Sequence, residues 1–168
     1  MRLISENDLG FHLHGGQWIL QNRSFPSYDS YTYTVSDKPY INLHWLYQIL
    51  IYSVYAVNGF NGISILYVLL IATVFFLMHF WMRSKEASFT LTLWLLLGAM
   101  LTIEARFNFR PEVMTWIFMI LILIGLDNYL RNRQRILWLL PVVMILWANT
   151  QGLFVIGLLF IGAYVISD

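Results

Sequence analysis

Cysteine is absent from the 168-residue sequence, and charged residues make up only 11% of it. The missing cysteine excludes disulfides, CxxC redox chemistry and thiolate metal sites, so a metal site would have to use carboxylates or imidazoles. The scarcity of charge excludes a soluble domain, because soluble chains carry about a quarter charged residues. The net charge is only +1 and no basic block is present. We therefore expect no nucleic-acid partner.

Apolar side chains are abundant instead, at 59% of residues with a mean hydropathy of +0.65. After a polar first part, five segments are apolar enough to cross a membrane as helices: 62–82, 88–102, 113–130, 136–148 and 153–167. The last two are short, and Pro141 is expected to kink the fourth segment. Residues 149–152 predict a tight helical hairpin. The predicted fold class is all-α, a polytopic membrane bundle of about five transmembrane helices.

Two domains are expected. Residues 1–60 should form an extracytoplasmic loop with two interfacial helices, and residues 61–168 should form the transmembrane bundle. The first interfacial helix is predicted over 8–22, where apolar and polar residues fall on different faces. The second is predicted within 41–57, whose short apolar run is interrupted by His44, Gln48 and Ser53. An ordinary sixth span over 41–57 is the alternative.

Basic residues suggest which loops face the cytoplasm. Arg83 and Lys85 follow the first span, and three arginines at 131, 133 and 135 follow the third, so both loops should be cytoplasmic. If 41–57 does not cross the membrane, the N-terminal segment lies outside with the other polar residues. Five of the ten basic residues then lie inside and five outside. If 41–57 crosses, they divide eight inside against two outside. Charge alone favours the crossing.

Asp8 and His12 are four residues apart in the first predicted helix and therefore share a face. Asp8 is a candidate general base or metal ligand, with Glu6 as a second carboxylate. The alternative is that Asp8 only caps the helix and complements its dipole. His12 and His14 point about 200° apart on a helix, so they cannot share an ion.

A second group of polar residues surrounds a predicted outward-facing turn. Arg110 could bind the phosphate of a lipid-linked substrate, because its guanidinium presents forked donors. In the alternative interpretation, Pro111 and Glu112 start a helix, and Arg110 pairs with Glu112 or Glu104.

A third group lies at the predicted hairpin. Asn149 and Gln151 could bind sugar hydroxyls, while Trp147 could anchor at the interface or stack on a sugar ring. The alternative is a simple turn with an interfacial tryptophan.

These motifs follow one another in a characteristic order: Glu6-Asn7-Asp8-Leu9-Gly10-Phe11-His12-Leu13, Gly16-Gln17-Trp18-Ile19, Asn42-Leu43-His44-Trp45-Leu46, Arg110-Pro111-Glu112 and Trp147-Ala148-Asn149. The succession resembles the N-terminal part of bacterial membrane glycosyltransferases of the GT-C superfamily. In that family an acid-containing external loop is followed by helices that lie along the membrane. The resemblance therefore implies that 41–57 lies along the membrane surface and that residues 1–60 lie outside, although charge alone favours a crossing. Because such enzymes are several times longer and begin with a further membrane helix, we expect this chain to be a fragment.

The resemblance implies a multi-pass enzyme of the bacterial cytoplasmic membrane that moves a sugar from a polyprenyl-phosphate donor to an extracytoplasmic glycan or lipid acceptor. Asp8 would be the catalytic base or part of a metal site, with the carboxylate of Glu6 in support, and a divalent cation is the one candidate cofactor. The substrate-binding candidates are His12, His44, Arg110, Glu112, Asn149 and Gln151. Two positions depart from the family pattern, since Glu6 stands where Asp is usual and Gln151 where His is usual.

Two other classes of function compete with the enzyme. A transporter or flippase subunit would line a central path with charged residues such as Glu104, Arg106 or Asp127. A non-catalytic membrane scaffold would use Asp8 and Arg110 only at the ends of helices.

Overall fold

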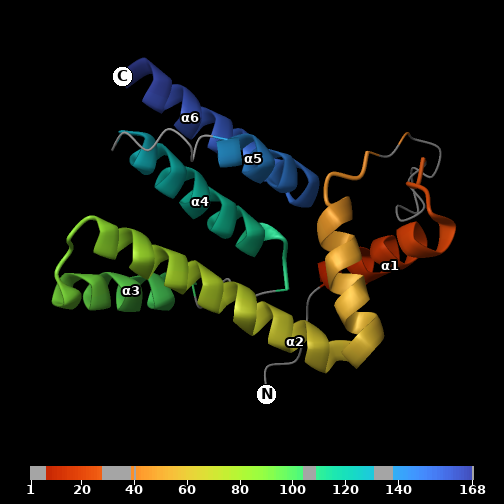
Figure 1. Ribbon diagram of the computed structural model, residues 1–168. Coiled ribbons are helices and arrows are strands. Elements are labelled where there is room, and N and C mark those ends of the chain that lie inside the picture. Colours follow the sequence, from red (N-terminus) through yellow and green to blue (C-terminus); the bar gives the residue numbers. More distant parts are fainter. Residues whose placement is uncertain (1–6, 28–38, 40, 104–108, 131–137, 168) are drawn as a thin grey trace.

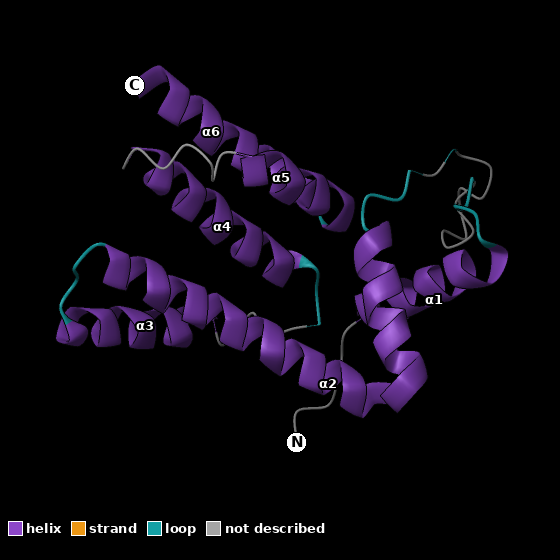
Figure 2. Cartoon of the chain, in the orientation of Figure 1, coloured by secondary structure: helices purple, strands orange, loops and turns teal. Residues whose placement is uncertain are grey.

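The structure is a computed structural model that describes residues 7–27, 39, 41–103, 109–130 and 138–167. Helices make up the architecture of these residues (Figures 1 and 2). In chain order they are α1 (Asn7–Asn22), α2 (Trp45–Ser84), α3 (Phe89–Ile103), α4 (Glu112–Leu130), α5 (Leu139–Thr150), the 3-10 helix η3 (Gly152–Phe154) and α6 (Val155–Ser167). The predicted all-α fold class and the helix at 8–22 are confirmed.

Helix α2 changes direction in its middle. Asn58 has φ −141° and ψ 21°, and Gly59 has φ 56° and ψ −147°, so the helix is interrupted at these two residues. A positive φ with this ψ is a conformation that glycine adopts far more readily than other residues. The break divides α2 into a first arm (45–57) and a long arm (60–84), which run at a steep angle to each other in Figure 1.

Helix α1 packs across the first arm of α2 (Figure 1). The contact is close because glycines face it: a Cβ atom placed on Gly16 would lie 2.1 Å from the backbone oxygen of Gln48. Leu9 of α1 and Tyr47 and Ile51 of the first arm are buried in one cluster, which Ile63 from the start of the long arm completes. α1 and the first arm thus form a unit at one end of the molecule.

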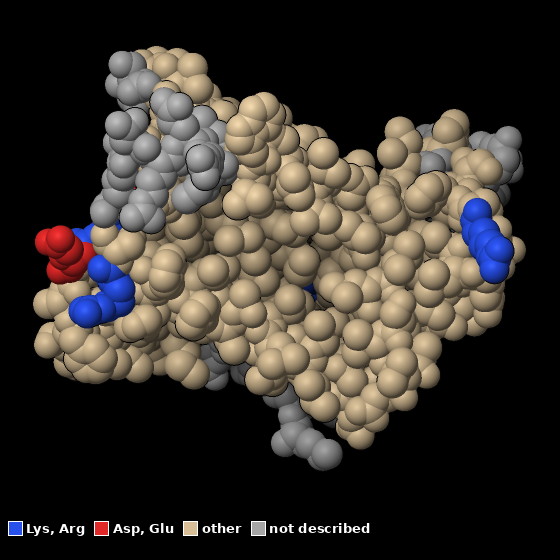
Figure 3. Space-filling view, in the orientation of Figure 1, with Lys and Arg blue, Asp and Glu red and all other residues tan. Residues whose placement is uncertain are grey.

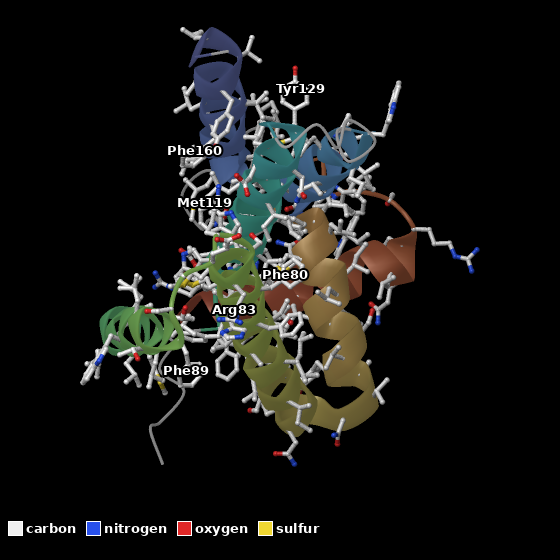
Figure 4. All side chains as sticks on the ribbon, turned by 60° about the vertical axis from the view of Figure 1, so that its left-hand side comes forward. Phe80, Arg83, Phe89, Met119, Tyr129 and Phe160 are labelled. Atoms are coloured by element: carbon white, nitrogen blue, oxygen red, sulfur yellow. The ribbon has the colours of Figure 1, made fainter. Side chains whose placement is uncertain are left out.

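The remaining helices pack side by side away from that unit (Figure 1). One apolar core joins the long arm of α2 to α4 and contains Tyr67, Val74, Val113, Ile117 and Ile120. A second core joins α4 to α5 and α6 and contains Phe118, Ile122, Leu126, Leu140 and Trp147. In Figure 4, Met119 of α4 and Phe160 of α6 lie in the region of this second core. Helix α3 packs against α2.

Two of the described helices are long and apolar enough to cross a membrane, α2 and α4, the latter over Glu112–Tyr129. Shorter apolar helices cover Phe89–Leu101, Leu139–Thr150 and Gly152–Ile166. Many large apolar side chains on these helices are exposed, for example Val68, Phe76 and Leu159 at 66%, 67% and 68%. Apart from Ser88, which precedes α3, all five segments predicted as spans are helical in their described parts. Five membrane crossings remain a prediction.

Pro141 does not kink a helix as expected. Helix α5 begins at Leu139, so Pro141 lies in its first turn. The first four backbone N–H groups of a helix have no partner within the helix, and a residue without an N–H is therefore tolerated there. The predicted hairpin at 149–152 is confirmed, because α5 ends at Thr150 and η3 follows from Gly152.

The close packing of α1 makes Gly16 sensitive to a single methyl group. We expect Gly16→Ala to reduce the free energy of unfolding by about 1–3 kcal/mol, because a backbone carbonyl must move to make room. Gly10→Ala is the matched control, since a Cβ atom there meets nothing within 4 Å and helix propensity then favours alanine by roughly 0.5–1 kcal/mol. Thermal unfolding in detergent micelles measures both changes, and equal melting temperatures for the two variants would contradict this packing.

Candidate functional site

The site lies where α1, the first arm of α2, the start of α4 and the hairpin after α5 come together. Its charged centre is an ion pair between Asp8 of α1 and Arg110, two residues before α4, with 3.5 Å between Oδ2 and Nη2. The side chains are 54% and 46% exposed respectively. Half-exposed pairs of this kind contribute about 0–1 kcal/mol, so another anion can displace Asp8 from the guanidinium.

His12 is buried beside this ion pair, with only 4% of its surface exposed. Its ring meets those of Tyr47 and His44 edge-on, at centroid distances of 5.1 and 5.7 Å. Burial, followed by the nearby His44, lowers the pKa of His12 to about 4, although Asp8 acts in the opposite direction. His12 is therefore neutral at pH 7. Its Nδ1 atom has no hydrogen-bond partner within the described part of the chain.

His44 is held in one tautomer by the hairpin. Its Nε2 atom lies 2.8 Å from Oε1 of Gln151, and the backbone N–H of Gly152 donates to the same oxygen at 2.7 Å. Because a backbone N–H can only donate, the shared atom must be the amide oxygen, and Nε2 of His44 must carry a proton. In neutral His44 the lone pair consequently lies on Nδ1, which can accept a hydrogen bond.

A second hydrogen bond joins the same two elements. Nε1 of Trp45 donates to Oδ1 of Asn149 at 2.8 Å, and Nδ2 of Asn149 donates to the carbonyl of Ile145 at 2.7 Å. The two amides that were predicted to bind sugar thus lie at the site, and their oxygens also hold the first arm of α2 against the hairpin. Their role toward a sugar stays a prediction.

Trp147 departs from its expected position at the membrane interface or on a sugar ring. It is fully buried in the core between α4 and α5. Its ring stacks on Phe118, and its Nε1 atom donates to Oγ1 of Thr115 at 3.3 Å. A tryptophan next to a turn indicates an interface only if that side of the helix is exposed, and here it packs against α4.

Two polar residues of the site, Asn42 and Gln48, are part of the sequence patterns but were not predicted as site residues. The Oδ1 atom of Asn42 accepts from the backbone N–H of His44 at 3.1 Å, and its Nδ2 atom donates to Oε1 of Gln48 at 2.6 Å. Gln48 is fully buried against the glycines of α1. Their role depends on how α1 crosses the first arm, and no local pattern encodes that crossing.

Glu112 opens α4, where the positive end of the helix dipole stabilises a carboxylate. Its Oε2 atom is buried and makes no hydrogen bond with the residues that the structure describes. Arg110 forms an ion pair with Asp8. Its alternative pairing with Glu112 or Glu104 stays a prediction. Glu6, Glu104 and Arg106 lie outside the described residues.

A divalent cation needs several oxygen ligands. Among the described residues no three His, Asp or Glu side chains come together in a group that could hold a metal ion. Asp8, the carboxylate expected to serve as a ligand, is paired with Arg110. The described donor set therefore falls short of a divalent-cation site.

Comparisons of the chain with protein-family models, curated proteins and solved structures gave no match. The geometry of the site and the order of the motifs are therefore the guides to its function.

The depressed pKa of His12 predicts a pH-dependent stability. Between pH 6.5 and about 4 the unfolded chain binds a proton at His12 that the folded chain does not. The free energy of unfolding therefore falls as the pH drops through this window, by up to about 3 kcal/mol, and is fully restored above it. Denaturant unfolding in micelles at pH 7 and pH 5 should show a smaller pH difference for His12→Gln than for the unchanged protein. His14→Gln, at an exposed position of the same helix, should keep the full difference; an unchanged pH difference in His12→Gln would contradict the burial of a neutral imidazole.

Proposed function

We propose that the protein is a multi-pass glycosyltransferase of the GT-C type in the bacterial cytoplasmic membrane. It transfers a sugar from a polyprenyl-phosphate donor to an extracytoplasmic glycan or lipid acceptor. The observation that carries the proposal is the ion pair between Asp8 and Arg110. Two residues distant in sequence, one suited to act as a base and one to bind phosphate, meet at one end of an apolar bundle.

The end of the molecule opposite the site supports an orientation in which the site faces outward. Arg83 and Lys85 lie at the turn from α2 to α3, and Figure 4 shows Arg83 near Phe89, the first residue of α3. In Figure 3 charged side chains gather at this end, and the face between the two ends is almost free of them. Basic residues favour the cytoplasmic side. The candidate site then lies at the extracytoplasmic surface, where a polyprenyl-linked sugar is met by its acceptor.

In the proposed reaction, Asp8 accepts the proton of an acceptor hydroxyl while the oxygen attacks the anomeric carbon of the donor sugar. A new glycosidic bond forms, and the bond from the anomeric carbon to the phosphate oxygen breaks. The electron pair leaves with polyprenyl phosphate, whose charge Arg110 stabilises through its forked donors. Glu6 is proposed to support Asp8, and the proton returns from Asp8 to solvent.

The ion pair also suggests an order of binding. As long as Arg110 holds the carboxylate of Asp8, the base is masked. The donor phosphate competes with Asp8 for the guanidinium, and a weak half-exposed pair offers little resistance to that exchange. Donor binding therefore frees the base before the acceptor is deprotonated. His12, His44, Glu112, Asn149 and Gln151 are proposed to line the pocket that receives the sugar.

The transporter alternative requires intramembrane charges along a path. Asp127 of α4, one of the three candidates, is buried and bonds to Nζ of Lys85 at the end opposite the site. The other two lie outside the described residues. The scaffold alternative leaves Asp8 and Arg110 with structural roles alone, and loss of the carboxylate then has no effect on sugar transfer.

Replacement of the proposed base tests the enzyme directly. We expect Asp8→Asn to lower transfer from a radiolabelled polyprenyl-phosphate sugar by at least about 100-fold, because the amide cannot accept the proton. Protein abundance in the membrane should not change, since Asp8 is half exposed. Glu86→Gln, which removes an exposed carboxylate at the α2–α3 turn, should retain the full rate.

Near-normal transfer by Asp8→Asn would remove Asp8 from the mechanism. An unmodified protein that transfers no sugar from a panel of polyprenyl-phosphate donors would instead favour the transporter or the scaffold.

A further inference from the structure

The backbone of Arg110 is held by a tyrosine of the long arm. The hydroxyl of Tyr67 accepts a hydrogen bond from the N–H of Arg110 and donates one to the carbonyl of the same residue, each at 2.5 Å. A phenol can do both, because it carries one proton and lone pairs. Tyr67 is 7% exposed, and its ring meets that of Phe109 edge-on at 4.9 Å.

The peptide group that joins Phe109 to Arg110 is also held from the other side of the break in α2. Tyr47 of the first arm is fully buried, and its hydroxyl donates to the carbonyl of Phe109 at 3.2 Å. Two tyrosines, one from each arm, thus fix consecutive residues of the turn that leads into α4. The backbone of Arg110 has a fixed place, while its half-exposed side chain reaches Asp8.

A fixed backbone position matters for Arg110 because its guanidinium must reach the donor phosphate. A displacement of about 1 Å at a reacting group can cost roughly 100-fold in rate. We propose that Tyr67 is a positioning residue, whose hydroxyl sets the place of Arg110 relative to Asp8 so that the guanidinium meets the phosphate of the lipid-linked donor. The assignment of Arg110 to the donor phosphate rests on the proposed function. The placing of Arg110 by Tyr67 does not.

Removal of the Tyr67 hydroxyl tests whether this residue affects binding of the donor. Tyr67→Phe keeps the ring contact with Phe109 and loses both hydrogen bonds to Arg110, and we expect the KM for the donor to rise roughly tenfold with no change in the KM for the acceptor. Tyr55→Phe is the matched control, because its hydroxyl makes no hydrogen bond with the described residues and its ring packs against Phe60. In an Arg110→Ala background, Tyr67→Phe should cause no further rise in the donor KM. A tyrosine with a purely structural role would still raise it in that background.

A second measurement needs no activity. The natural absence of cysteine allows Asp8→Cys and Arg110→Cys to be combined and cross-linked with a short bis-maleimide in native membranes. The ion pair is then missing, so the backbone alone sets the separation. We expect cross-linking to slow several-fold when Tyr67→Phe is added and to stay unchanged when Tyr55→Phe is added.

Equal cross-linking rates in the two backgrounds, or an unchanged donor KM in an active Tyr67→Phe enzyme, would overturn the inference. If the unmodified protein transfers no sugar, the proposed function fails separately, and the cross-linking rate alone decides whether Tyr67 places Arg110.

Discussion

The break at Asn58 and Gly59 is the constraint on which the rest of the structure depends. A straight helix of 40 residues would be about 60 Å long, roughly twice the hydrocarbon thickness of a bilayer. The change of direction instead carries the first arm across the end of the bundle, where α1 packs on it through Gly15 and Gly16. Without the break, Trp45 and His44 could not reach the hairpin that follows α5. The helices that form the site would then not come together.

A chain so poor in polar side chains uses them where its elements join. His44 and Trp45 are bound to Gln151 and Asn149, two tyrosines hold the turn before α4, and Asp8 meets Arg110. Most of these contacts link residues far apart in sequence. Each gives a partner to a polar group that would be costly to leave unpaired near hydrocarbon. The polar contacts that fix the fold are thus also the surroundings of the proposed chemistry. Only the ion pair is exposed enough to rearrange when a substrate arrives.

Much of this could be read from the sequence, and the limits are physical. Helix 8–22 and the apolar segments follow from local patterning. Asp8 was singled out because it shares a helix face with His12, and Arg110 because its guanidinium suits a phosphate. The burial of Trp147 and the place of Pro141 in a first turn depend on where α5 begins and what it packs against. Tyr67 lies in an apolar run with nothing to distinguish it, since its hydroxyl acts on a residue 43 positions away.

In the proposed orientation the site faces one side of the membrane and the α2–α3 turn faces the other. Single cysteines in place of Ser24, Leu153 and Ser84, all exposed, can be probed in spheroplasts with a membrane-impermeant maleimide. We expect the cysteines at Ser24, near the end of α1, and at Leu153, in the hairpin, to react in intact spheroplasts. The cysteine at Ser84, at the end of α2, should react only after permeabilisation. If the cysteines at Ser24 and Leu153 react from opposite sides, Asp8 and Arg110 cannot share an extracytoplasmic site, and the proposed enzyme is contradicted.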